Sequence, residues 1–124
     1  MPPTVSSIYP TDNQSGVSIS DNISVTFTES IDNTSVTTNT SNTTCSGSFQ
    51  LSSDNFSSCI QMSSSPSSSN LDKTFTLDPY SNLSRSTTYK IRVSNGVKDT
   101  TGNTLSSRYE TTGGFTTKSW TKQS

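Results

Sequence analysis

Residues 82–93 read NLSRSTTYKIRV, and this stretch decides the fold class. Its second half alternates apolar with charged residues: Tyr89, Lys90, Ile91, Arg92 and Val93. A period of two is typical of a β-strand that buries one face and exposes the other. The stretch therefore predicts a strand over 87–93 whose aromatic and branched side chains enter a core.

The same alternation recurs along the chain, and helix signals are almost missing because alanine is absent. Clear strands are expected at 23–28 and 74–77, and turn clusters separate the candidates. About seven or eight short strands predict an all-β Greek-key sandwich. Weaker strands are expected at 5–9, 16–19, 48–51, 58–62 and 113–117, and the serine-rich run 63–70 is expected to be a surface loop. The predicted core comprises Ile23, Val25, Phe27, Phe75, Leu77, Tyr89, Ile91, Val93 and Phe115.

Composition indicates one folded domain with a hydroxyl-rich surface. The chain has 124 residues, a hydrophobic share of 25% and a net charge of -1, and roughly two residues in five are Ser or Thr. Disorder normally couples low hydrophobicity to high net charge, which this chain lacks. No cluster of cations suits nucleic acid, and no apolar run approaches the roughly 20 residues of a membrane-spanning helix. We expect a single domain over 1–124, with its core at about 4–117 and a tail or linker at 118–124.

Two cysteines, Cys45 and Cys59, carry a prediction about covalent structure. Two thiols without histidine cannot complete a tetrahedral zinc site. The sequence favours a disulfide, which would stabilise the fold by about 3 kcal/mol and indicate an oxidising compartment. Two buried free thiols are the alternative.

Leu83 stands six residues before Tyr89, at the entry to the clearest strand. In Greek-key sandwiches a tyrosine in this position often bonds through its hydroxyl to a backbone group a few residues upstream. The spacing predicts such a tyrosine corner; an ordinary core tyrosine is the alternative.

Several motifs together resemble a known family. They are the Pro-Thr-Asp opening at 10–12, the Phe-x-Glu-x-x-Asp step from Phe27 to Asp32, the Leu-to-Tyr spacing and the Asp-x-x-Gly-Asn run at 99–103. In this order, from about residue 4 to 117, they resemble the bacterial Ig-like domains of surface-layer proteins and large tandem-repeat surface or secreted proteins. The cysteine pair departs from the general pattern of that family.

The resemblance implies an Ig-like or fibronectin type III-like sandwich that serves as a structural or adhesive repeat outside the cell. Its expected partners are neighbouring Ig-like domains of the same chain, and a surface glycan or protein. The residues themselves give no catalytic set: histidine is absent, no serine lies in a Gly-x-Ser-x-Gly elbow, and the carboxylates are scattered. We therefore expect no enzymatic activity.

Calcium is the only cofactor the sequence suggests, and it would lie in the turn VSNGVKDTTGNTL (93–105). Asp99 and Asn103 offer side-chain oxygens there, and Glu29 with Asp32 lie in another turn. Calcium takes six to eight oxygen ligands, which is more than these residues supply. A structural turn in which Asp99 bonds local backbone is the preferred interpretation, with calcium as the alternative.

Trp120 follows the last predicted strand. It is expected to cap one end of the sandwich, contact a neighbouring domain or stack on a sugar. The competing functional class is a carbohydrate- or protein-binding module, which would show a platform of exposed aromatics. The candidates for such a platform are scattered in sequence: Phe56, Tyr80, Tyr109 and Trp120.

Overall fold

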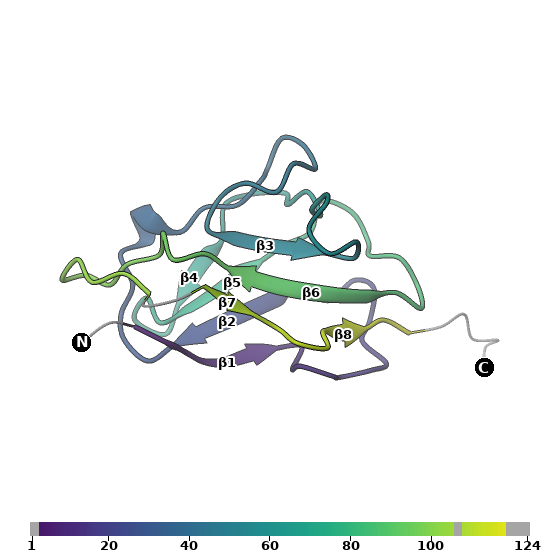
Figure 1. Cartoon of the computed structure of the whole chain (residues 1–124), viewed down its shortest axis with the longest axis horizontal. Helices are drawn as coiled ribbons and strands as arrows, with labels where there is room; N and C mark the ends of the chain where they lie inside the picture. Colours follow the sequence, from purple (N-terminus) through teal and green to yellow (C-terminus); the bar gives the residue numbers. More distant parts are fainter. Residues whose placement is uncertain (1–2, 106–107, 119–124) are drawn as a thin grey trace.

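The computed structural model describes residues 3–105 and 108–118 of the chain as two packed antiparallel sheets of four strands each (Figure 1). A single 3-10 turn, η1 (Asn33–Ser35), follows the second strand. The strands are β1 (Val5–Tyr9), β2 (Ile23–Phe27), β3 (Phe49–Ser52), β4 (Ser67–Ser69), β5 (Thr74–Leu77), β6 (Thr88–Val93), β7 (Tyr109–Glu110) and β8 (Phe115–Thr116).

Strand order identifies the topology. One sheet runs β1-β2-β5-β4, and the other runs β3-β6-β7 with β8 also paired to β6. This is the ABED and CFG arrangement of a seven-strand Ig-type sandwich, with β7 and β8 sharing the place of the last strand. The chain crosses between the sheets after β2, after β3 and after β5, which makes the fold a Greek key. The predicted all-β Ig-like sandwich is confirmed.

The core lies between the two sheets because each central strand turns its apolar phase inward. Phe27 of β2 and Phe75 of β5 meet Phe49 of β3 across the interface, with ring centroids 6.0–6.2 Å apart. The tilted and edge-to-face geometry is the arrangement that aromatic rings prefer. On β6, Tyr89 stacks on Phe115 of β8 at 5.6 Å.

All nine predicted core residues are buried, so this prediction is confirmed. The structure adds further members that alternation did not single out, among them Ile31, Val36, Val97 and Leu105 from loops. These residues reach the core from connecting segments, where a period of two has no meaning. The core is therefore larger than the strand pattern indicates.

Two expected strands are wrong. Residues 16–19 and 58–62 contribute only isolated bridges, Val17 to Thr117 and Met62 to Pro79. Proline has no backbone N–H, so the pairing beside Pro79 cannot continue as a ladder.

The serine-rich run contains a strand where a loop was expected. Ser67–Ser69 form β4, the exposed edge of the first sheet, and pair with Thr74–Thr76 of β5. Serine has little intrinsic preference for strands, but β5 offers an unpaired row of backbone groups that these residues can bond. β7 was also not expected, and it pairs with Arg92 and Val93 of β6.

The first and last described residues lie at opposite ends of the long axis (Figure 1). Thr4 pairs with Thr28 just beyond the end of β2. Lys118 bonds Val17 and Ser86 at the other end. The chain therefore enters the sandwich at one end and leaves it at the other.

Candidate functional site

Tyr89 joins strand β6 to the crossover that precedes it. The backbone N–H of Ser84 donates to the Tyr89 hydroxyl at 2.8 Å. The Tyr89 ring is buried, and so is Leu83, whose own N–H donates to the carbonyl of Ile19 at 2.9 Å. The structure thus brings Leu83 and Tyr89 together with a backbone donor five positions upstream, which is the contact a tyrosine corner requires.

Cys45 and Cys59 are joined by a disulfide, with 4.9 Å between their Cα atoms. The backbone around the bond is paired as well: Cys59 N–H donates to the carbonyl of Thr43, and Ile60 N–H donates to that of Leu51, both at 2.7 Å. The bond therefore links the 40–46 loop to the 53–59 loop, and both loops lie beside the outer edge of β3. We call these two loops the loop pair.

Asp54 organises the second loop of the pair. Its carboxylate accepts from the Ser58 hydroxyl at 2.6 Å, from the Ser58 N–H at 3.0 Å and from the Ser52 hydroxyl at 2.7 Å. These hydrogen bonds favour the charged form and lower the pKa of Asp54 to about 2. A charged aspartate thus closes the loop on itself.

Phe56 occupies an unfavourable backbone conformation in the same loop. Asn55 and Phe56 have φ values of 61° and 65°, as in a type I′ turn, where the second position normally holds glycine. The guanidinium of Arg92 lies 4.0 Å from the centre of the Phe56 ring and donates to Gln50 at 2.9 Å. This cation–π contact offsets part of the conformational cost.

The 93–105 turn is organised around a buried carboxylate. Asp99 accepts from the N–H groups of Thr101 and Asn103 at 3.0 and 2.9 Å, and from the Thr101 hydroxyl at 2.8 Å. Burial raises the pKa of Asp99, but the hydrogen bonds from Asn103 and Thr101 outweigh it and hold the pKa well below its usual range. Asp99 acts first as the hub of a structural turn.

The structure brings the backbones of the two candidate calcium turns side by side. Ile31 bridges to Asp99, and Asp32 N–H donates to the carbonyl of Lys98 at 2.9 Å. Their side chains have separate tasks, however, because the Asp32 carboxylate accepts from the hydroxyl and the N–H of Thr34. These two bonds lower the pKa of Asp32.

Among the described residues, the candidate calcium-binding side chains of the two turns are not gathered into one group. No hydrogen bond or ion pair involving the side chain of Glu29 occurs in the described structure. Within the described residues, no group of three or more His, Cys, Asp or Glu side chains is arranged to hold a metal ion. Calcium binding therefore stays a prediction for solution measurements.

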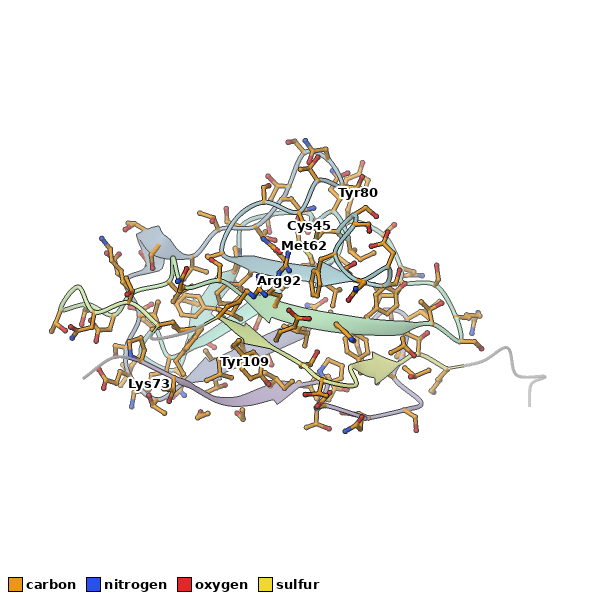
Figure 2. The ribbon with its side chains drawn as sticks, in the orientation of Figure 1. Cys45, Met62, Lys73, Tyr80, Arg92 and Tyr109 are labelled. Carbon is orange, nitrogen blue, oxygen red and sulfur yellow. A yellow bond between two sulfur atoms is a disulfide. The ribbon has the colours of Figure 1, made fainter. Side chains whose placement is uncertain are left out.

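The exposed aromatic residues do not form a platform in the part of the chain that the structure describes. Figure 2 shows Tyr80 and Tyr109 on widely separated parts of the sandwich, and Phe56 lies against Arg92. Tyr80 is 68% exposed and stands in a turn. Trp120, the fourth candidate, lies outside the described residues.

Asp12 is a structural residue that the sequence did not reveal. Its carboxylate accepts from the N–H groups of Gly113 and Gly114 at 3.1 and 2.7 Å, across about a hundred positions of sequence. Asn13 N–H also donates to the Gly114 carbonyl at 2.6 Å. The Pro-Thr-Asp motif at 10–12 was recognised as part of the family resemblance, but only the fold places it against the segment that leads into β8.

Comparison with known proteins gives one sequence family and several related folds. The sequence model of the bacterial Ig-like domain matches residues 1–117. A search of the curated proteins found no match. Among the described residues, no helix is long and apolar enough to cross a membrane.

The solved structures with a similar fold include bacterial surface-layer proteins. The N-terminal part of the bacterial S-layer protein SbsC aligns with a TM-score of 0.64 and 24% identity, over 95% of this chain and 24% of that chain. SbsC residues 31–844 align with a TM-score of 0.61 and 25% identity, over 95% and 14%. Domains 1–6 of the same surface-layer protein give 0.62 and 24%, over 95% and 14%. This chain thus corresponds to a small part of each of those chains.

The family match covers nearly the whole sequence, and the strand order, the hydroxyl of Tyr89 and the Asp99 turn supply a matching sandwich. The chain belongs to the bacterial Ig-like domain family.

Proposed function

We propose that this protein is a non-catalytic extracellular spacer, one structural repeat in a larger bacterial surface or secreted protein. The single observation that carries the proposal is that the first and last described residues lie at opposite ends of the long axis (Figure 1). Modules with this arrangement can be joined head to tail into an extended rod without rearrangement. The proposed partners are neighbouring Ig-like domains of the same chain.

Two further features support a mechanical role. The backbone at the end where the chain enters is tied across loops by the Ile31–Asp99 bridge and the Asp99 turn. At the other end, the Thr117 hydroxyl donates to the carbonyl of Ser84 at 2.6 Å, which fastens the last described segment to the β5–β6 crossover. A stretching force applied at the two ends of the sandwich would therefore act on hydrogen-bonded backbone at each end.

The likeness to surface-layer proteins also supports this role, since one of the similar structures is described as domains 1–6 of such a protein. A hydroxyl-rich surface with a net charge of only -1 suits a module that stands beside identical or related copies. It presents few like charges that would repel a neighbour.

Small-angle X-ray scattering of two copies joined in tandem through residues 118–124 tests the spacer proposal. We expect an elongated particle whose largest dimension is about twice that of one module, and no change when salt is raised. A particle in which the copies fold against each other side by side would contradict the proposal. The single chain, measured under the same conditions, provides the reference dimension.

The extracellular location is tested separately on the full-length gene product. Protease treatment of intact cells should remove the module, and mass spectrometry of the released fragment without reductant should find both cysteines protected from alkylation. A module that survives until the cells are lysed, or that takes up two labels, would contradict the location.

Adhesion to a glycan or a protein is the alternative role. A broad glycan array probed with the single chain tests this role, because an adhesin is expected to retain a defined class of glycan on the array. Binding through exposed Tyr80 would be lost in Tyr80→Ser and would favour a binding module.

A further inference from the structure

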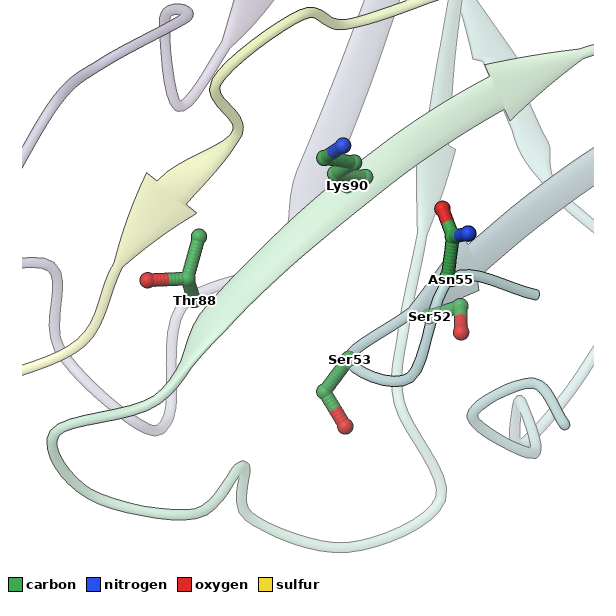
Figure 3. A pocket seen from close by; sticks show the side chains of 5 residues that line it. All are labelled: Ser52, Ser53, Asn55, Thr88 and Lys90. Atoms are coloured by element: carbon green, nitrogen blue, oxygen red, sulfur yellow. The ribbon is translucent and has the colours of Figure 1, made fainter. Parts of the chain in front are cut away.

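A polar hollow of about 400 Å³ opens beside strand β6, on the face of the second sheet that points away from the core (Figure 3). Because Tyr89, Ile91 and Val93 are buried, the residues between them face outward. The hollow is lined by Ser52, Ser53, Asn55, Thr88 and Lys90. Its lining contains hydroxyls, one amide and one ammonium, and no aromatic or aliphatic side chain apart from the Lys90 stem.

Lys90 supplies a positive charge that the described structure does not neutralise. The ion pair found among residues 3–105 and 108–118 joins Arg108 to Glu110, and no described carboxylate lies within ion-pair distance of Lys90. The Lys90 stem lies beside Gly114, where a side chain would clash with the Tyr89 carbonyl and crowd the Lys90 Cγ. The absence of a side chain at Gly114 therefore leaves space for the first part of the Lys90 stem.

Arg92, the next outward residue on β6, is already engaged. Its guanidinium donates to Gln50 and lies on the Phe56 ring. Lys90 is therefore the cation of this face that is left for a ligand.

The opposite wall of the hollow is held rigidly. Asn55 stands in the strained turn that Asp54 closes from within, and the Cys45–Cys59 disulfide anchors the end of the same 53–59 loop. Backbone strain of this kind persists only where the surroundings impose it, and it is common at binding sites. The loop pair thus presents the Asn55 amide in a fixed place, facing Lys90 across the hollow (Figure 3).

We propose that this hollow binds an acidic saccharide through a carboxylate-bearing sugar such as a uronic acid. The Lys90 ammonium pairs with the carboxylate, while the Asn55 amide and the Ser53 hydroxyl bond the ring hydroxyls. Thr88 only lines the hollow, because its hydroxyl is already hydrogen-bonded to that of Thr116 at 2.9 Å. The volume falls within the range of small-molecule sites, roughly 300–1,000 Å³. None of the five lining residues is aromatic or a large aliphatic residue, which disfavours a lipid or an aromatic ligand.

The charge of the whole chain does not explain such binding. With a net charge of -1 the protein does not attract anions from a distance, so recognition has to come from the local arrangement around Lys90. The site is open and offers few contacts, so we expect a dissociation constant of about 1 mM, near the weak end of specific binding.

An NMR titration of the ¹⁵N-labelled chain with trigalacturonic acid tests the proposal, with maltotriose as the neutral trisaccharide control. We expect saturable shifts of the amides of Ser53, Asn55, Thr88 and Lys90 with the acidic sugar, and much smaller shifts with the neutral one. Lys90→Gln should weaken binding about tenfold, the loss expected for one charged hydrogen bond. Asn55→Asp, which keeps a residue suited to the turn but adds a negative charge, should weaken it too.

Lys98→Gln is the matched control, because it removes the same charge from an exposed turn at the end where the chain enters. Its affinity should equal that of the parent chain. Equal binding of both trisaccharides, equal losses in Lys90→Gln and Lys98→Gln, shifts confined to other residues, or no shifts up to about ten times the expected dissociation constant would each overturn the proposal. None of these results bears on the scattering test of the spacer role.

Discussion

The inter-sheet core and the loop pair are stabilised by different interactions. In the core, Phe27, Phe49 and Phe75 meet across the two sheets with essentially no exposure. In the loop pair, most side chains are exposed serine, threonine and asparagine, and order comes from one disulfide and the carboxylate of Asp54. A hydrophobic share of 25% is thus enough to build the core. The surface loops depend instead on a disulfide and on local hydrogen bonds.

The comparison shows how a chain with so few apolar residues folds. Nearly every large apolar side chain in the described structure is used in the core, with Leu71, 82% exposed, as a clear exception. The remaining polar chain cannot be ordered by burial, and Asp12, Asp54 and Asp99 each hold a loop by accepting backbone N–H groups. Five predictions test this division, from the largest effect to the smallest.

Phe75→Ala should cause the largest loss. Removing a buried aromatic ring costs about 3–5 kcal/mol, a large part of the total stability of roughly 5–15 kcal/mol. Urea denaturation measures the change. Leu71→Ala serves as the control and should change the free energy of unfolding by less than about 0.5 kcal/mol. Similar losses in both variants would contradict the division between core and loops.

Replacing both Cys45 and Cys59 with serine should cost about 3 kcal/mol by the chain-entropy estimate. The loss should be accompanied by faster hydrogen exchange in the loop pair, while the amides of β2, β5 and β6 keep their relative protection. Exchange that rises evenly over the whole sandwich would show that the disulfide supports the core rather than the loops.

Tyr89→Phe should lose about 1 kcal/mol, because the N–H of Ser84 is left without its partner in a partly buried place. Thermal unfolding provides the measurement. Tyr9→Phe is a suitable control, since the Tyr9 hydroxyl donates to Asp21 at the surface. An unchanged melting temperature in Tyr89→Phe would show that the ring packs in the core without acting as a corner.

Acid should destabilise the fold through Asp54 and Asp99. Their pKa values are depressed in the folded state, so their contribution is complete above the unfolded value of about 4 and is lost as the pH falls toward the folded values, about 2 for Asp54. The melting temperature should fall between about pH 4 and pH 2. Asp54→Asn should make this fall shallower, and an equally steep fall in that variant would remove Asp54 from the explanation.

Calcium should have the smallest effect. The carboxylate of Asp99 already accepts from Thr101 and Asn103, and that of Asp32 accepts from Thr34. We expect equal melting temperatures in calcium and in chelator. A calcium-dependent rise that disappears in Asp99→Asn but persists in Asp54→Asn would establish the ion in the 93–105 turn.

The sequence was most informative where the structure repeats locally. Alternation gave β2, β5 and β6 and the nine core residues, because the side chains of a half-buried strand necessarily point to opposite faces. It failed for β4, where three serines carry no pattern and become a strand only because β5 lies beside them. The residues of 93–105 predicted the Asp99 turn, but they did not predict its contact with the segment around Ile31.

The hollow beside Lys90 is also a contact between distant segments that the sequence alone does not predict. The outward phase of Thr88 and Lys90 could be read from residues 87–93. Their proximity to Asn55 could not, because the two segments are separated by more than thirty positions and meet through the pairing of β3 with β6. The sequence also did not indicate that the Cys45–Cys59 disulfide fixes a loop that lines this hollow.

By itself, the sequence determined an all-β sandwich of the bacterial Ig-like family and its core strands. The tertiary structure decided which loops meet, which carboxylates hold them and where a polar hollow opens beside Lys90. The physical reason is that strand periodicity is a property of neighbouring residues, whereas the pairing of loops depends on the packing of two sheets and is set only when the whole chain has folded.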